Sequence, residues 1–154
     1  MVATVFRHDD TNAQGLFSVL VPEGTWTIRH RVVTPIAGIE RIDHEIADLP
    51  VLAGIDLGTV VLPLGYHIQG IVTGSAGELI QGADFDALYA LTGESIYIAS
   101  DTSNSNGSFD ILLPEGDIVI EVDPPLTGPV RVPKKMTLSL APISPINLGQ
   151  IILE

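Results

Sequence analysis

One loop carries the residues best suited to bind a cation. Its sequence, DTSNSNG over residues 101–107, places oxygen-bearing side chains ahead of a glycine, as calcium loops do. A calcium loop also needs an acid at its twelfth position, and this loop has none. A hairpin turn rich in Asn and Ser is the stronger interpretation. We therefore predict no cofactor, and calcium is the one alternative that remains open.

The histidines and potential nucleophiles do not form a recognisable catalytic or metal motif. No histidine lies three or four residues from another, the spacing common among metal ligands. The four are His8, His30, His44 and His67. His44 is flanked by Asp43 and Glu45, for which a solvated charged loop is the better interpretation. The sequence lacks cysteine and a Gly-x-Ser-x-Gly motif, so we predict that the protein is not an enzyme.

The composition restricts the class of partner. Seven Lys and Arg residues stand against 19 Asp and Glu residues, which gives a formal net charge of -12. Phosphate binding needs clustered cations, so such a surface repels nucleic acid and anionic lipid. The sequence contains no run of about 18 apolar residues, and we predict no membrane span.

The elements that must position these residues occur twice. Residues 9–28, DDTNAQGLFSVLVPEGTWTI, match residues 101–120, DTSNSNGSFDILLPEGDIVI, at an offset of 92 (101 − 9). Residues 55–62, IDLGTVVL, match residues 146–153, INLGQIIL, at an offset of 91 (146 − 55). Self-similarity of this extent predicts two tandem modules.

The two copies differ in length. Met1 aligns with Gly93, so the stretch Tyr66–Thr92 of the second copy has no counterpart in the first. We predict an incomplete β-sandwich repeat that lacks its first strands in residues 1–64, and a complete β-sandwich repeat in residues 65–154.

Apolar and polar side chains alternate in both copies, a pattern typical of half-buried strands. The expected inward-facing residues are Phe109, Ile111, Leu113, Ile118, Ile120 and Val122 in the second copy, and Trp26, Ile28 and His30 in the first. Eleven prolines and fifteen glycines separate these short runs, and only Ile36–Ala47 could hold a helical turn. The pattern predicts an all-β protein built as a sandwich or barrel.

Motifs of the second copy occur in an order that resembles a known family. They are YHIQGIVT at 66–73, GELIQGA at 77–83, NGSF at 106–109 and LPEG at 113–116. This order is similar to that of the carboxypeptidase regulatory-like domain. The resemblance implies an immunoglobulin-like, transthyretin-like β-sandwich that serves as a stalk, spacer, adhesin or accessory module, extracellular or at the cell surface.

Three glycines of the second copy have predictable roles. Gly82 and Gly107 fall where turns need a residue without a Cβ. Gly70 lies in the middle of a strand, which predicts a bulge or a close approach of two backbones.

The incomplete copy predicts assembly. A sandwich that lacks its first two strands leaves backbone N–H and C=O groups unpaired, and such edges recruit strands from other chains. The expected assembly edge is formed by Ala3, Thr4, Val5 and Phe6. We therefore predict a non-enzymatic extracellular structural or adhesive module that joins copies of itself by strand donation, into a dimer or fibre. The alternative is that these residues are a fragment cut from a longer tandem array, in which case neighbouring repeats of that longer chain are the candidate partners.

The alternative function is that of a carbohydrate- or calcium-binding accessory module of a larger secreted protein. Trp26, Tyr66, Tyr89 and Tyr97 carry rings that could stack on sugars. Trp26 aligns with Ile118, an expected inward-facing position, which favours a place in the core over a place on a binding surface.

Overall fold

Every regular element of the computed structural model is a β-strand over the residues that it describes, 10–32, 40–141 and 145–154. Strands make up 48% of these described residues and helices 0%, so the predicted all-β class is confirmed. The prediction of a helical turn within Ile36–Ala47 is wrong for residues 44–47, which belong to a strand. The described part of the chain contains no helix that is long and apolar enough to cross a membrane.

The chain divides into two units. The N-terminal unit comprises residues 1–28 and 46–60, and the C-terminal unit comprises residues 29–45 and 61–154. Strands β1 (Gly24–His30) and β2 (His44–Val51) form a two-stranded sheet and both continue across this division. The module boundary near residue 64 stays a prediction.

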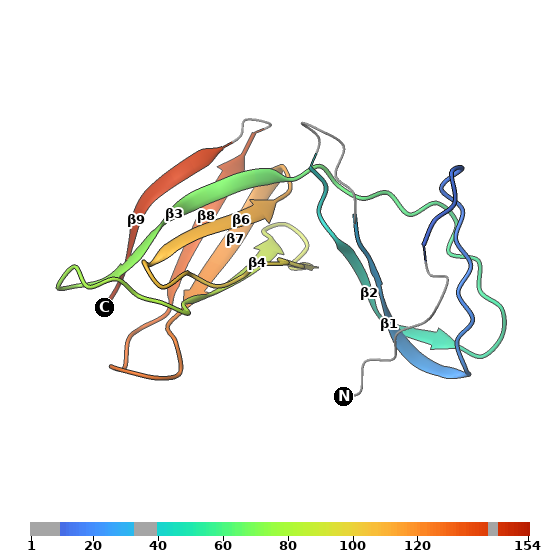
Figure 1. The fold of residues 1–154 in the computed structure, drawn as a ribbon, viewed down its shortest axis with the longest axis horizontal. Helices are drawn as coiled ribbons and strands as arrows, with labels where there is room; N and C mark the ends of the chain where they lie inside the picture. Colours follow the sequence, from blue (N-terminus) through green and yellow to red (C-terminus); the bar gives the residue numbers. More distant parts are fainter. Residues whose placement is uncertain (1–9, 33–39, 142–144) are drawn as a thin grey trace. The chain divides into compact units, whose positions relative to one another are not determined.

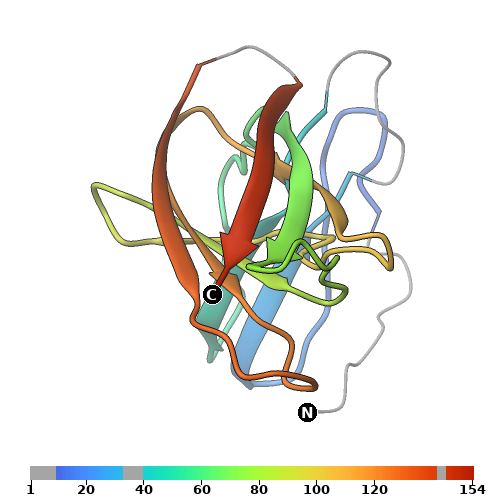
Figure 2. The ribbon, with the colours of Figure 1, turned by 90° about the vertical axis from the view of Figure 1, so that its left-hand side faces the viewer.

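Seven strands build two sheets in the C-terminal unit (Figure 1). The order of the first sheet is β6-β3-β9, from β3 (Tyr66–Gly74), β6 (Ser108–Leu113) and β9 (Ile146–Leu153). Strand β3 is antiparallel to β6 and parallel to β9, which lies beside it in Figure 2. The order of the second sheet is β5-β4-β7-β8, from β4 (Asp84–Tyr89), β5 (Ser95–Ile96), β7 (Gly116–Asp123) and β8 (Lys134–Leu140).

Side chains of both these sheets together form one buried hydrophobic cluster. Phe85 of β4 and Phe109 of β6 are in ring contact, with their centroids 4.5 Å apart. All six inward-facing residues predicted for this copy are at most 3% exposed: Phe109, Ile111, Leu113, Ile118, Ile120 and Val122. The arrangement is consistent with a β-sandwich.

The predicted roles of the three glycines are confirmed. The register of β3 against β9 shifts between Gln69 and Ile71, so that Gly70 lies opposite a bulge in β9 at Leu148 and Gly149. A Cβ on Gly70 would lie 2.7 Å from the carbonyl oxygen of Gly149 and from the ring of Phe109. The turn glycines, Gly82 and Gly107, have φ angles of 74° and 72°.

Strand β1 shows the predicted alternation but a shallower burial. Trp26, Ile28 and His30 are half-buried, and the residues between them are exposed. The counterparts of Trp26 and Ile28 in the second copy, Ile118 and Ile120, are 0% and 1% exposed. The same residue pattern therefore produces a complete core in the second copy only.

Candidate functional site

The turns of the two copies repeat each other in their hydrogen bonds. In the first copy the N–H of Asn12 donates to the carbonyl of Leu16, and the N–H of Gly15 donates to the carbonyl of Asn12. The same two bonds recur in residues 104–108. The N–H of Gly58 donates to the side chain of Asp56 at 2.8 Å, and in the second copy the N–H of Gly149 donates to the side chain of Asn147 at 2.7 Å. The internal repeat is therefore a property of the backbone as well as of the sequence.

Two segments that are strands in the second copy are not strands in the first. At the offsets of 92 and 91, residues 16–21 correspond to β6 and residues 55–62 to β9, yet neither segment is in a strand. Both β6 and β9 pair with β3 in the C-terminal unit. We refer to residues 16–21 and 55–60 as the acceptor segments. Both belong to the N-terminal unit.

Strands β1 and β2 of the first copy behave differently from these two segments. At the same offsets, β1 and β2 correspond to β7 and β8, which pair with each other in the C-terminal unit. Both partners of this pair are present in the first copy, and both are strands. Among the described residues of the first copy, this pair forms the sheet, whereas residues 16–21 and 55–62 remain outside strands.

The side chains that a central strand would cover are partly open in the first copy. Phe17, Val19 and Val21 are half-buried, whereas their counterparts on β6 are at most 3% exposed. Leu20 is 92% exposed. Over its described residues, the N-terminal unit contains no fully buried side chain.

The assembly edge predicted at Ala3, Thr4, Val5 and Phe6 lies outside the described residues. The acceptor segments were not predicted as a site. The signal for them was available, because residues 16–21 and 55–62 align with two strands that share one partner. Recognising it required the strand order of the second copy.

The loop at residues 101–107 forms the predicted turn. Ser103 is 4% exposed, and its hydroxyl donates to the carbonyl of Ile80 at 2.7 Å and accepts from the N–H of Ala83 at 2.9 Å. The side chain of Asn106 accepts from the N–H of Ser108 at 3.1 Å. These oxygens therefore stabilise the turn itself. The described residues hold no cluster of three or more His, Asp or Glu side chains placed to bind a metal ion.

The charged loop predicted around His44 is wrong. His44 begins β2, and the adjacent Glu45 forms an ion pair of 2.7 Å with Arg29 of β1. The sheet also stacks the rings of His30 and His44, whose centroids are 6.0 Å apart. Their spacing in the sequence could not predict this contact, since the pairing of two distant strands creates it.

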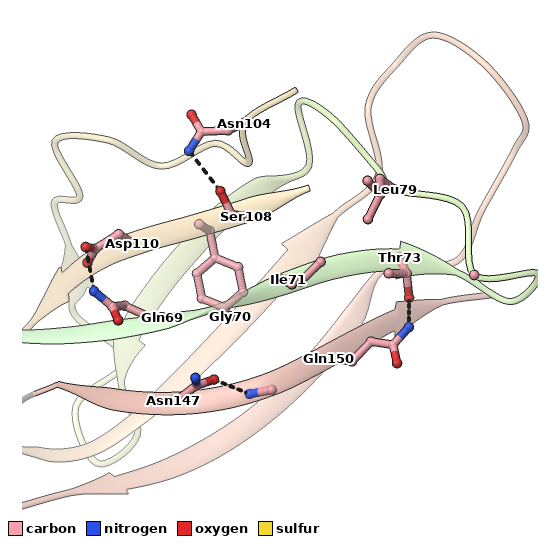
Figure 3. Close-up of a pocket in the computed structure, with 13 residues that line it drawn as sticks. Gln69, Gly70, Ile71, Thr73, Leu79, Asn104, Ser108, Asp110, Asn147 and Gln150 are labelled. Carbon is pink, nitrogen blue, oxygen red and sulfur yellow. Dashed lines mark hydrogen bonds between the residues drawn. The ribbon is translucent and has the colours of Figure 1, made fainter. Parts of the chain in front are cut away.

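An open hollow of about 780 Å³ lies on the outer face of the β6-β3-β9 sheet (Figure 3). Gly70 and Gly149 line part of it, where neither contributes a side chain. Ile71, Leu79 and Phe109 contribute apolar surface to the hollow. Amide, hydroxyl and carboxylate groups also line it, from Gln69, Thr73, Asn104, Ser108, Asp110, Asn147 and Gln150. Such a surface can exchange hydrogen bonds with a polar ligand.

Many polar groups of the hollow already bond to one another (Figure 3). The amide of Gln69 donates to Asp110 at 2.8 Å, and the amide of Gln150 donates to the hydroxyl of Thr73 at 2.6 Å. A ligand would therefore compete with these internal bonds, which favours weak binding.

His67, at the start of β3, lies between two carboxylates. Its Nδ1 is 2.6 Å from Asp110 and its Nε2 is 2.7 Å from Glu40. The hydrogen bond with Asp110 is the main cause that raises the pKa of His67, and the charges of Asp110 and Glu40 add to it. The two acids thus stabilise the imidazolium form.

We expect the C-terminal unit to lose stability as the pH rises above about 6.5. The folded state raises the pKa of His67, so its contribution is fully present below the pKa of the unfolded chain. It is lost as the pH rises through the higher folded-state pKa. His67→Gln should remove this part of the pH dependence, measured as the free energy of unfolding in urea at pH 6 and pH 8. The same loss in the variant would contradict the assignment to His67.

Comparison with known proteins does not assign the chain to a family. Neither the family models nor the curated proteins gave a match. The resemblance to the carboxypeptidase regulatory-like domain therefore stays a prediction that rests on the motifs themselves.

Proposed function

We propose that the chain is a non-enzymatic structural or adhesive module, extracellular or at the cell surface, that assembles through β-strand pairing. The observation that supports the proposal most is the state of the acceptor segments. They match two strands of a three-stranded sheet, yet neither of them lies in a strand. Backbone edges of this kind recruit strands from other chains.

Apolar exposure supports the same proposal. Leu16 and Leu20 are 68% and 92% exposed in the first acceptor segment, and Ile55 is 45% exposed in the second. The inward-facing Phe17, Val19 and Val21 are half-buried, so addition of a strand would bring further apolar burial as well as backbone hydrogen bonds. We include the immunoglobulin-like form of the sandwich and its tandem arrangement in this proposal.

We expect residues 1–154 to form dimers or larger assemblies as concentration rises, measured by multi-angle light scattering. Val19→Pro should reduce association, because proline removes an N–H from the edge that corresponds to β6. Val19→Thr keeps that N–H and serves as the matched control. A fully folded chain that remains monomeric at high concentration would contradict assembly through strand pairing.

The hollow on the β6-β3-β9 sheet favours a second candidate function, carbohydrate binding by an accessory module. Its lining of amides and hydroxyls suits a polyhydroxylated ligand, whereas Trp26 and the tyrosines do not line it. A glycan that raises the melting temperature of the wild-type chain but not of Gln150→Ala would support this candidate. Calcium can be tested in the same assay.

A further inference from the structure

We propose that Asn106 is the attachment site of an N-linked glycan. Asn106, Gly107 and Ser108 form the acceptor sequence Asn-x-Ser/Thr, in which the middle residue is not proline. Neither Ser nor Thr stands two residues after any of the other asparagines, Asn12, Asn104 and Asn147. The inference rests on the proposed extracellular or cell-surface location, because this modification belongs to secreted proteins.

The turn before β6 presents Asn106 on a firmly held base. Asn106 is exposed, whereas its neighbour Gly107 is buried. A Cβ on Gly107 would lie 2.6 Å from the carbonyl oxygen of Val72, so this part of the turn packs closely against β3. Ser103, earlier in the same loop, is 4% exposed and bonds to the backbone through its hydroxyl. A bulky group on Asn106 therefore attaches without displacing packed atoms.

The carbonyl end of the Asn106 side chain is held by Ser108. Its Oδ1 accepts hydrogen bonds from the N–H of Ser108 at 3.1 Å and from the hydroxyl of Ser108 at 2.7 Å. Within the described part of the chain, no group accepts a hydrogen bond from the Nδ2 of Asn106. A sugar replaces one hydrogen of Nδ2 and leaves the amide carbonyl in place, so both bonds to Ser108 persist after modification.

The reaction transfers an oligosaccharide from a polyprenyl diphosphate carrier to Asn106. Nδ2 attacks the anomeric carbon of the sugar, and the bond between that carbon and the diphosphate oxygen breaks. The diphosphate leaves with the bonding electrons, and a base of the transferring enzyme takes one proton from Nδ2. The two hydrogen bonds from Ser108 draw electron density toward Oδ1, which makes the Nδ2 protons easier to remove.

The first copy has the same backbone turn without the acceptor sequence. Gln14 and Leu16 are the counterparts of Asn106 and Ser108. Their N–H groups both donate to the side chain of Asn12 at 3.0 Å, and no hydroxyl takes part. The modification therefore distinguishes the two copies.

A glycan on Asn106 would stand beside an open sheet edge. Strand β6 begins two residues after Asn106 and lies at the edge of the sheet β6-β3-β9. Such edges recruit strands from other chains. A bulky, hydrated glycan at the start of β6 would exclude them, and so would keep the C-terminal unit out of the strand pairing that the proposed function assigns to the first copy.

The test secretes the full chain from a eukaryotic host and measures its intact mass before and after treatment with peptide N-glycosidase. We expect a glycan mass that the enzyme removes, with Asn106 converted to Asp in the peptide map. Asn106→Gln and Ser108→Ala should lose this mass completely, whereas Ser108→Thr should keep it. A secreted wild-type chain that carries no glycan on Asn106 would overturn the inference.

The matched control is the double variant Gln14→Asn with Leu16→Ser. It recreates the acceptor sequence in the equivalent turn of the first copy, where residue 14 is also exposed. This variant should gain a second glycan. Modification at residue 14 while Asn106 stays bare would contradict the inference, because the host would then have modified the same sequence in the same kind of turn.

Light scattering separates the inference from the proposed function. Removal of the glycan should strengthen association, because the edge of β6 becomes accessible. A chain that carries the glycan and stays monomeric with or without it would support the attachment site and contradict assembly through strand pairing. A chain that lacks the glycan and still associates as concentration rises would overturn the inference and leave the proposed function standing.

Discussion

Phe109→Ala is expected to lower the free energy of unfolding of the C-terminal unit by about 3–5 kcal/mol, the range for truncation of a buried phenylalanine. Phe109 is 3% exposed and contacts the ring of Phe85 at a centroid distance of 4.5 Å. These two rings come from β6 and β4, so the substitution opens a cavity where side chains of the two sheets meet. Urea denaturation followed by circular dichroism measures the loss.

Phe17→Ala is the matched control, because Phe17 is the counterpart of Phe109 and is half-buried. Its removal should cost about 1 kcal/mol or less in the N-terminal unit, followed by the fluorescence of Trp26. If the two substitutions cost the same, the first copy would have a closed core and the acceptor segments would already be covered.

Gly107→Ala is expected to lower the free energy of unfolding of the C-terminal unit by about 3 kcal/mol. One part of the cost is conformational, since the φ of Gly107 is 72° and an L-residue there loses about 1–2 kcal/mol. The other part is steric. The new Cβ would lie 2.6 Å from the backbone oxygen of Val72, which cannot yield without disturbing the central strand β3.

Gly93→Ala separates the two parts. Gly93 lies in the same unit and has the same φ of 72°, but a Cβ on it would meet nothing within 4 Å. It should therefore cost only the conformational part, about 1–2 kcal/mol. Equal melting temperatures for the two variants would contradict the close packing of Gly107 against β3.

Features that depend on local pattern could be predicted from the sequence. The alternation of apolar residues identified Phe109, Ile111 and Leu113 as core residues, and all are buried. The glycine inside an apolar run predicted the close approach of two backbones at Gly70, opposite the bulge in β9. Both signals arise from the residue itself and its near neighbours.

Features that depend on distant pairing could not be predicted in this way. Residues 16–21 carry the same alternation as β6, yet they are not a strand, because β-propensity depends on the surrounding structure as well as on the residue pattern. The hollow was missed for a related reason. Its residues, such as Gln69, Asp110 and Gln150, become neighbours only through the order β6-β3-β9, which includes a parallel pair that no short motif encodes.

The parallel pairing of β3 with β9 has a mechanical consequence. The ladder runs from Ile68 opposite Ile146 to Gly74 opposite Leu153, so the chain enters β3 at one end of the ladder and leaves β9 at the other. Tension applied at these two points pulls adjacent strands in opposite directions along their length. The hydrogen bonds between them then share the load, whereas a hairpin pulled at its open end unzips one bond at a time. The C-terminal unit thus has the geometry of a tension-bearing link.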